Sequence, residues 1–256
     1  MCIFKVKQVE IRERALIYVL IPAFNEADHL RDLLPKIPSR VLGRRAGVIV
    51  VCDGSTDGTC RVAADHGAEV VRLWPNLGKG SAVRAGAALL DDREYEAVVT
   101  MDGDGQHKPA ELASLIRPVL IDQCDITIGS RYMVDPRRGP TPFNRYLVRT
   151  AFTRALRRIL DQPVTDPFSG LRCMSQSAFE TVTLFGDRYE GELEVRFEAE
   201  RHGLRIVEVP MKRIYASGQS KMAATGGRLR VIRGYTATVR RKTRELNAAR
   251  PRVPVA

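Results

Sequence analysis

Short apolar runs alternate with longer amphipathic stretches over the first half of the chain. The runs have the length of buried strands, and each of the first four precedes a stretch with helical spacing. They pair as Ala15–Pro22 with Ala27–Ile37, Gly47–Cys52 with Asp57–Asp65, Glu69–Leu73 with Gly78–Leu90, and Glu96–Met101 with Pro109–Ile121; Asp125–Gly129 follows. This alternation predicts a mostly parallel α/β sheet with helices on both faces.

The rhythm changes after Met133. A Pro- and Arg-rich link leads to the second half of the chain. There we expect a long basic helix at Phe143–Leu160, a loop at Thr165–Arg172, a helix at Glu190–His202, a strand at Leu204–Pro210 and a Gly/Ser loop at Ser217–Lys221. Further on, Leu229, Ile232, Tyr235 and Val239 recur at helical spacing among arginines, which predicts a basic amphipathic helix. Only the tail after Asn247 is expected to be disordered.

Composition narrows the class of protein. The 256 residues are 44% hydrophobic and 28% charged, as in a soluble globular chain. The longest apolar run, Ala15 to Ile21, is far shorter than the ~20 residues of a spanning helix. No secretory signal is evident near Met1, so we expect a cytoplasmic protein. Five cysteines without a C-x-x-C pair, and scattered histidines, argue against a disulfide framework or a zinc cluster.

Positive charge is concentrated in two segments. Residues 225–256 hold nine Lys or Arg and one acid, and residues 131–158 hold eight Arg and one acid, within a chain of net charge +11. Two basic stretches favour contact with an anionic surface or with phosphate, although a solvated face is the simpler alternative. Nucleic acid is not expected as a partner, because no aromatic stacking set or readout motif accompanies the charge.

Polar residues follow four of the predicted strands. The first strand ends in Pro22–Glu26 rather than in G-x-G-x-x-G. The main motif that would indicate a dinucleotide-binding dehydrogenase is therefore missing at this position. Asp53 could accept hydrogen bonds from a base or ribose, and Lys79 lies at a helix start, where anions are favoured. Asp102 and Asp104 are two residues apart, which on an extended chain puts both carboxylates on one side. Such a pair suits Mg²⁺ bound together with substrate phosphates, although aspartates also cap helices and shape turns.

Taken in order, these motifs resemble the family 2 inverting glycosyltransferases of the glycosyltransferase A-type fold, particularly the dolichyl- and polyprenyl-phosphate mannosyl- or glucosyltransferases. The resemblance covers about residues 16–221. The matching motifs are Pro22-Ala23-Phe24-Asn25-Glu26, Asp53-Gly54-Ser55-Thr56-Asp57, Asn76-Leu77-Gly78-Lys79-Gly80, Asp102-Gly103-Asp104-Gly105-Gln106-His107, Gly129-Ser130-Arg131-Tyr132, Asp166-Pro167-Phe168-Ser169-Gly170-Leu171-Arg172 and Gly218-Gln219-Ser220-Lys221.

The resemblance implies roles for individual residues. Nucleotide binding would fall to Pro22, Asn25, Glu26, Asp53, Lys79 and Asp102, with Asp53 reading the base. Asp102, Asp104 and Gln106 would hold Mg²⁺ or Mn²⁺, and Asp102 and Asp104 would also meet the ribose. Arg131 and Arg172 would face acceptor phosphate or donor diphosphate. It further implies a nucleotide-sugar-binding half (1–132), an acceptor-binding half of the same catalytic domain (133–222), and a basic C-terminal helix and tail (223–256).

Simpler roles stay open for several of these residues. Glu26 could be a helix N-terminal acid, Lys79 a solvated side chain, and Arg131 a partner for Asp135. The chain also departs from the family pattern at two positions. Cys52 stands where a first acid is usual and is interpreted as a buried strand residue. Tyr215 replaces an arginine often found before the G-x-S-K loop, which weakens that loop as a diphosphate contact.

The sequence therefore predicts a metal-dependent enzyme that moves a hexose from GDP-mannose or UDP-glucose to a polyprenyl (dolichyl) phosphate. An anionic phosphate needs cations rather than a base, which suits Arg131, Arg145, Arg172 and Lys221. A hydroxyl acceptor would need a base, and Asp166 is the candidate unless it only shapes its loop. The basic C-terminal helix would hold the enzyme peripherally on the inner face of the membrane, or would pack on the catalytic domain. A catalytically idle nucleotide-sugar or membrane-binding protein is the remaining alternative.

Overall fold

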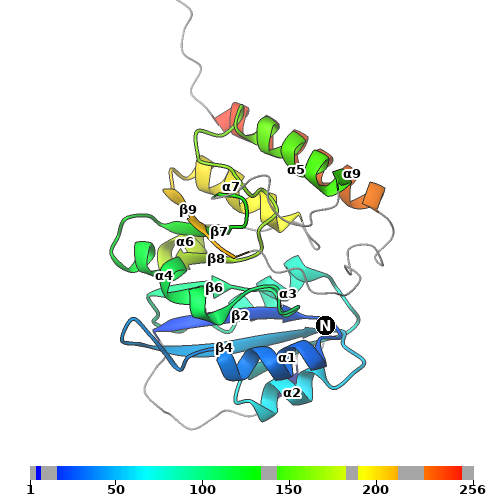
Figure 1. Ribbon diagram of the computed structural model, residues 1–256, viewed down its shortest axis with the longest axis vertical. Helices are drawn as coiled ribbons and strands as arrows, with labels where there is room; N and C mark the ends of the chain where they lie inside the picture. Colours follow the sequence, from blue (N-terminus) through cyan, green and yellow to red (C-terminus); the bar gives the residue numbers. More distant parts are fainter. Residues whose placement is uncertain (1–3, 7–15, 134–142, 183–189, 213–227, 250–256) are drawn as a thin grey trace, which may run out of the picture.

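A computed structural model describes residues 4–6, 16–133, 143–182, 190–212 and 228–249, with the backbone alone at 4–6, 143–145 and 228–229. Its elements alternate as the apolar pattern predicts (Figure 1). The strands are β1 Phe4–Val6, β2 Ile17–Ala23, β3 Arg40–Val41, β4 Arg44–Asp53, β5 Glu69–Leu73, β6 Ala97–Thr100, β7 Ile126–Ser130, β8 Arg172–Ser175 and β9 Ile206–Pro210. The α-helices are α1 Ala27–Leu33, α2 Thr59–Asp65, α3 Lys79–Ala87, α4 Leu112–Leu120, α5 Phe143–Leu156, α6 Gln176–Thr181, α7 Gly191–Arg201 and α9 Arg228–Ala249. The short 3-10 helices are η1 Leu34–Lys36 and η2 Pro109–Glu111.

Within the described residues, one sheet runs through the molecule in the order β1-β5-β4-β2-β6-β8-β7-β9, and β3 pairs with β4. Strands β5, β4, β2 and β6 are parallel, whereas β8 is antiparallel to both β6 and β7. The carboxyl ends of the four parallel strands therefore meet along one edge. This arrangement confirms the predicted mostly parallel α/β sheet.

The alternation of side chains along β2 divides the core into two layers. Ile17, Val19 and Ile21 belong to the cluster that packs against α1, α2 and α4. Tyr18 and Leu20 belong to the cluster that packs against α3. Successive strand residues point to opposite faces, so a continuous apolar run buries both faces at once, as expected for a parallel sheet covered by helices.

A third layer of helices lies beyond β7–β9. Helix α7 packs Val195 and Ala199 toward the sheet and Leu193 and Phe197 toward α5 and α9. Helices α5 and α9 lie side by side at the far end of the molecule (Figure 1). Helix α7 is therefore buried on both sides, which explains why its charged residues must find partners within the protein.

Several elements differ from the sequence prediction, including the short strands β1 and β3, which were not predicted. Strand β8 and helix α6 lie in a stretch where no element was predicted beyond the loop Thr165–Arg172. The basic helix predicted to reach Leu160 ends as an α-helix at Leu156. A four-residue strand directly after a polar loop has too few residues to establish a period of two, which is why the pattern did not reveal β8.

Candidate active site

The loop after β2 is joined to the loop after β4 by hydrogen bonds. Asn25, with φ 52°, accepts from the backbone N–H of Thr56 at 2.9 Å and donates its own N–H to Ser55 at 3.1 Å. The backbone N–H of Glu26 donates to Thr59 at 2.9 Å. The Glu26 carboxylate is buried and lies 2.5 Å from Nδ1 of His29. Pro22, Asn25 and Glu26 thus lie together at the carboxyl edge of the sheet, and their predicted contact with a nucleoside stays a prediction.

Asp53, at the end of β4, holds the loop that leads into α3. Its two carboxylate oxygens accept the backbone N–H groups of Leu77 and Gly78, both at 2.7 Å, and its side chain is almost fully buried. Asn76 returns a hydrogen bond to the Asp53 carbonyl at 2.8 Å. Asp53 therefore has a structural role that the sequence did not predict, and its proposed reading of the base would use acceptor sites that these bonds leave open.

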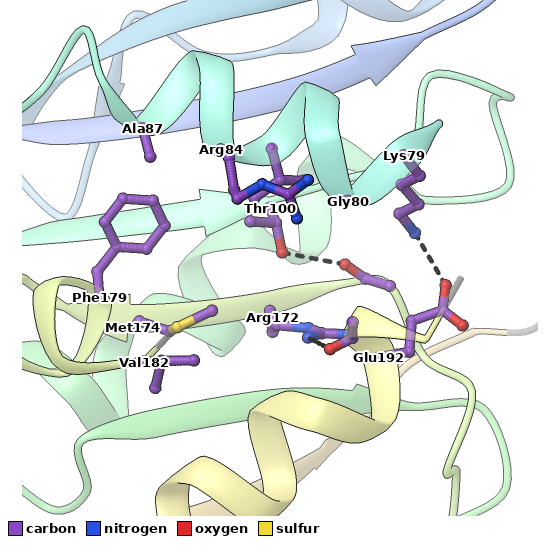
Figure 2. Close-up of a pocket in the computed structure, with 13 residues that line it drawn as sticks. Lys79, Gly80, Arg84, Ala87, Thr100, Arg172, Met174, Phe179, Val182 and Glu192 are labelled. Carbon is purple, nitrogen blue, oxygen red and sulfur yellow. Dashed lines mark hydrogen bonds and ion pairs between the residues drawn. The ribbon is translucent and has the colours of Figure 1, made fainter. Parts of the chain in front are cut away.

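Lys79, the first residue of α3, bridges two carboxylates. Its Nζ lies 2.5 Å from Asp102 Oδ1. It also lies 3.0 Å from Glu192 Oε1 (Figure 2). Burial alone would lower the pKa of Lys79, but the charges of Asp102 and Glu192 raise it above its ordinary value. Burial alone would raise the pKa of Asp102, but Lys79 and His107 lower it well below its usual range. Lys79 is therefore a charged, fixed cation beside Asp102, and the solvated alternative for this residue is wrong.

Asp102 and Asp104 lie in the turn after β6 rather than on the strand itself. Asp104 accepts the backbone N–H of Gln106 at 3.0 Å. Burial first, and then the negative charges of Asp102 and Glu26, raise the pKa of Asp104. Burial and these two charges outweigh the opposing charge of His107, and a bound metal ion would relieve the remaining excess of negative charge around Asp104.

The described residues fit a divalent cation only in part. They contain no group of three or more His, Cys, Asp or Glu side chains arranged to hold a metal by themselves. Mg²⁺ usually takes one or two carboxylates and completes its oxygen shell with water and substrate phosphates. Asp102 and Asp104, with Gln106 beside them, match that donor set. A cation here would therefore arrive with a phosphorylated ligand.

Space beside this pair is closed by Gly170, which precedes β8. A Cβ added at Gly170 would overlap Nζ of Lys79 and would lie 2.6 Å from Oδ2 of Asp102. Thr100 donates a hydrogen bond to the Gly170 carbonyl at 3.1 Å and holds the backbone there. The glycine of the predicted Asp166–Arg172 motif is thus explained by the close approach of the Lys79–Asp102 pair.

Arg131 and Asp166 form a two-pronged ion pair. Nε and Nη2 of Arg131 lie 2.7 and 3.0 Å from the two oxygens of Asp166, whose side chain is fully buried. Burial alone would raise the pKa of Asp166, but the charge and hydrogen bonds of Arg131 lower it. The described carboxylate partner of Arg131 is therefore Asp166. Asp135, the alternative partner that the sequence left open, lies outside the described residues. A carboxylate paired in this way is a poor proton acceptor.

Arg172 is a buried cation whose described hydrogen-bond partners are both carbonyls. It donates to the backbone oxygens of Gly191 and Ser169, at 3.2 and 2.8 Å. Among the described residues no carboxylate lies within ion-pair distance, and its buried Nε has no partner. Burial, only partly offset by the charge of Glu192, lowers the pKa of Arg172 to about 10. Such a side chain favours an anionic ligand.

Two predicted acceptor-phosphate residues cannot be placed. Lys221, with the whole Gly218–Lys221 motif and Tyr215, lies outside the described residues. Arg145 lies on α5, but its side chain is not described. Cys52 is buried in β4, as predicted.

Comparison with known proteins decides the family. The model for Glycosyl transferase family 2 matches residues 18–183. The chain belongs to this family. An undecaprenyl-phosphate mannosyltransferase from Micrococcus luteus is 30% identical over 216 residues, which cover 81% of this chain and 87% of that protein. A UDP-N-acetylglucosamine–dolichyl-phosphate N-acetylglucosaminyltransferase from Methanococcus voltae is 28% identical over 219 residues, covering 78% and 86%.

The fold comparison agrees with the family. Glucosyl-3-phosphoglycerate synthase from Mycobacterium tuberculosis, solved in complex with uridine diphosphate, superposes with a TM-score of 0.71 at 24% identity, over 90% of this chain and 80% of that one. This similarity confirms the glycosyltransferase A-type fold. Family and fold together make the protein a glycosyltransferase.

For this family 2 glycosyltransferase, sequence reasoning missed several residues that the fold brings to the site. Glu192 reaches Lys79 from α7, 113 residues away along the chain. Arg149 of α5 stacks over Tyr132 with its guanidinium 4.2 Å from the ring centroid. His107 was quoted only as part of a motif, yet it lies 3.7 Å from Asp102. For Glu192 and Arg149 no sequence signal distinguishes them from other helix charges, because their partners are distant along the chain.

Proposed function

We propose that this glycosyltransferase moves a hexose from a nucleoside diphosphate sugar to a polyprenyl phosphate, with inversion at the anomeric carbon. Two relatives whose names specify polyprenyl phosphates as acceptors support this proposal, since the similarity spans most of each chain. The choice of acceptor depends on one observation, the ion pair between Asp166 and Arg131. Asp166, the candidate base for a hydroxyl acceptor, is engaged in this ion pair and is therefore a poor proton acceptor. An anionic phosphate acceptor needs no base.

The donor would lie along the sheet edge. Pro22, Asn25, Glu26 and Asp53 would surround the nucleoside, and Asp102 and Asp104 would meet the ribose and, with Gln106, a divalent cation. When bound, Mg²⁺ or Mn²⁺ would neutralise charge on the departing diphosphate. Lys79 would share that task, because it already stands as a fixed cation between Asp102 and Glu192.

The acceptor would be held by positive side chains. Arg172 is buried without a carboxylate partner among the described residues, and Arg131 stands on the neighbouring loop; Arg145 and Lys221 are proposed to join them. A phosphate oxygen of the lipid would attack the anomeric carbon while the bond from that carbon to the diphosphate breaks. The electron pair leaves on the diphosphate, so no proton moves. Alignment of the two reactants is then the main contribution of the protein, and good orientation can be worth ~7–11 kcal/mol.

The membrane is proposed as the place of reaction. Among the described helices none is long and apolar enough to cross a bilayer. Exposed arginines follow one face of α9 at spacings of three, seven and four, at Arg230, Arg233, Arg240 and Arg244. Leu147, on α5, is an exposed apolar side chain. This combination would suit attachment to the anionic inner leaflet, next to a lipid acceptor.

A donor panel tests the proposal. The protein is incubated with GDP-mannose, UDP-glucose or UDP-N-acetylglucosamine, a short polyprenyl phosphate and Mg²⁺ or Mn²⁺, and released nucleotide and glycolipid are measured together. One donor should yield both products in equal amounts. Asp104→Ala should lower the transfer rate by at least a hundredfold with an unchanged melting temperature, whereas Asp92→Asn, an exposed acid away from the site, should not. Full activity of Asp104→Ala would reject the catalytic assignment.

A hydroxyl acceptor remains the second candidate. It would be favoured if the lipid phosphate were ignored while nucleotide release required a sugar or polysaccharide, and if Asp166→Asn were inactive. Binding of a sugar nucleotide without release of nucleotide in the presence of either acceptor would favour the catalytically idle binding protein instead, and metal-stimulated hydrolysis of a sugar nucleotide would argue against it.

A further inference from the structure

Two consecutive residues, Thr165 and Asp166, connect two arginines of the candidate site, and we call them the linking segment. The Asp166 side chain accepts two hydrogen bonds from Arg131, at 2.7 and 3.0 Å. The Thr165 carbonyl accepts from Nη1 of Arg149 at 3.3 Å. Both arginines also approach the ring of Tyr132, with guanidinium carbons 5.8 and 4.2 Å from its centroid. The position of the linking segment therefore affects where both arginines stand.

Arg149 is a buried cation on α5, only 8% exposed, and its Nε has no hydrogen-bond partner. Besides the Thr165 carbonyl, it contacts the Thr150 hydroxyl and the rings of Tyr132 and Tyr146. Among the described residues no carboxylate lies within ion-pair distance of it. A buried guanidinium without a carboxylate favours an anionic ligand. Arg149 is therefore a second cation, beside Arg131, that could meet an acceptor phosphate.

One buried ion pair holds the linking segment from behind. Glu208 of β9 and Arg196 of α7 lie side by side (Figure 1), 2.6 Å apart, with side chains 2 and 1% exposed. The Glu208 carboxylate accepts the backbone N–H of Thr165 at 2.8 Å, its hydroxyl at 2.5 Å and the backbone N–H of Asp166 at 3.4 Å. Arg196 donates to the carbonyls of Asp166 and Pro163, at 3.2 and 2.9 Å. The N–H and the carbonyl of Asp166 are thus both bound by the same ion pair.

A buried ion pair is weak evidence for stability, because the desolvation of two charges can cancel their attraction. The geometry here points to another contribution, since the hydrogen bonds of both partners converge on one short segment. We propose that Glu208 and Arg196 are positioning residues, which fix the linking segment so that Arg131 and Arg149 are presented together to the phosphate of the acceptor. This inference rests on the proposed function. Neither positioning residue touches the acceptor; each acts on the two arginines through the linking segment.

A purely structural role makes a different prediction, and a second buried ion pair of α7 serves to separate the two. Glu198 pairs with Lys242 of α9, and these side chains are 2 and 1% exposed, as in the Arg196–Glu208 pair. The Glu198 pair joins two helices, whereas the Glu208 pair holds the linking segment. If Glu208 served only stability, removing either carboxylate charge should weaken the fold and leave the use of the acceptor alone.

The experiment compares Glu208→Gln with Glu198→Gln in steady-state kinetics. A short polyprenyl phosphate is supplied in solution without vesicles, so that membrane attachment does not contribute, and KM is measured for this acceptor and for the sugar nucleotide that the wild-type protein uses. Glu208→Gln is expected to raise the KM of the acceptor about tenfold, the effect of losing one hydrogen bond to a charged group, while the KM of the sugar nucleotide changes less than twofold. Glu198→Gln should leave both KM values within twofold, although urea unfolding should show that it destabilises the protein to a similar extent.

Three outcomes overturn the inference: an equal rise of both KM values in Glu208→Gln, no rise in the KM of the acceptor, or a Glu198→Gln variant in which that KM rises as much. Should Glu208→Gln not fold, Arg196→Lys decides, because lysine keeps the charge but lacks the planar fork that binds the two carbonyls. An unchanged acceptor KM in that variant rejects the positioning role.

Failure of the proposed function is distinct, because then the wild-type protein itself would make no glycolipid from any donor. If it used a hydroxyl acceptor instead, the same comparison would be made with that acceptor, for which Asp166 is the group held in place. An unchanged KM of that acceptor in Glu208→Gln would again reject the positioning role.

Discussion

The two aspartates Asp104 and Asp166 show how surroundings decide the chemistry of a carboxylate. Asp166 is buried against Arg131, which lowers its pKa. Asp104 is partly buried near the carboxylates of Asp102 and Glu26, and both the burial and these charges raise its pKa. The sequence motifs place Asp104 after a strand and Asp166 in a loop. They do not reveal which of the two carboxylates is paired with a cation. That difference follows from the arginine that the fold brings to Asp166.

The Arg131–Asp166 pair leads to a pH-dependent stability. A folded-state pKa lowered below the unfolded value of about 4 gives stability that is fully present above that pH and is lost as the pH falls through the folded-state pKa. Asp166→Asn should lower the free energy of unfolding by about 2–4 kcal/mol at pH 7, since it leaves a largely buried guanidinium without its charge partner. Urea unfolding at pH 7, 5, 4 and 3.5 measures the gap in the free energy of unfolding between the variant and the wild-type protein.

The gap should stay constant down to about pH 4 and narrow below it. Asp92→Asn, which changes an exposed acid, should show no gap at any of these pH values. An Asp166→Asn variant as stable as the wild-type protein at pH 7, or a gap that widens on acidification, would contradict the structural assignment of this pair.

At the scale of elements, helices α7 and α9 are joined by a ladder of two ion pairs and one hydrogen bond. Lys242 of α9 lies 2.5 Å from Glu198 of α7, and both side chains are almost completely buried. Arg241 reaches Glu194 at 2.6 Å, and Tyr235 reaches Glu192 at 3.0 Å. Part of the basic character of α9 thus serves packing, which the sequence analysis weighed as an alternative to membrane contact. The arginines proposed for membrane contact are different residues, on the exposed side of the same helix.

Breaking this ladder should loosen α9. Lys242→Met leaves the Glu198 carboxylate buried without its closest cation and should cost about 3 kcal/mol. The double variant Lys242→Met/Glu198→Gln should recover much of that loss, because neither charge is then stranded. Urea unfolding provides the free energies for a double-mutant cycle, and Arg244→Gln, on the exposed side of α9, serves as the control. Equal losses in the single and double variants would mean that the ion pair does not stabilise the docking of α9.

The elements also show how far sequence reasoning reaches. Strands β2, β4, β5 and β6 and their helices follow from apolar runs and helical spacing, because local burial alone sets those patterns. Strand β8 does not follow, since its antiparallel place between β6 and β7 depends on pairing across the sheet. In the candidate site, Asp102 and Lys79 were predicted from their motifs, whereas Glu192 was not. Its partner Lys79 is 113 residues distant, so only the assembled fold brings the two together.

At the scale of the whole molecule, exposed arginines lie both on α9 and on helices remote from it. Helix α9 lies at one extreme of the longest axis and α2 at the other (Figure 1). Arg233 and Arg240 are exposed on α9, whereas Arg61 and Arg117 are exposed on α2 and α4. If the membrane is met by the α5 and α9 end, then only the first pair of arginines should matter for binding to it.

Vesicle binding tests this orientation. Each arginine near an anionic leaflet contributes about 1 kcal/mol, so Arg233→Gln/Arg240→Gln should weaken binding to phosphatidylglycerol-containing vesicles by about tenfold or more. Arg61→Gln/Arg117→Gln removes the same charge from α2 and α4, away from α9, and should change binding less than twofold. Cosedimentation at 50 and 200 mM salt should show weaker binding at high salt, because screening shortens the range of the attraction, and little binding to vesicles of phosphatidylcholine alone. Equal effects of the two pairs would mean that net charge, rather than the α9 surface, draws the enzyme to the bilayer.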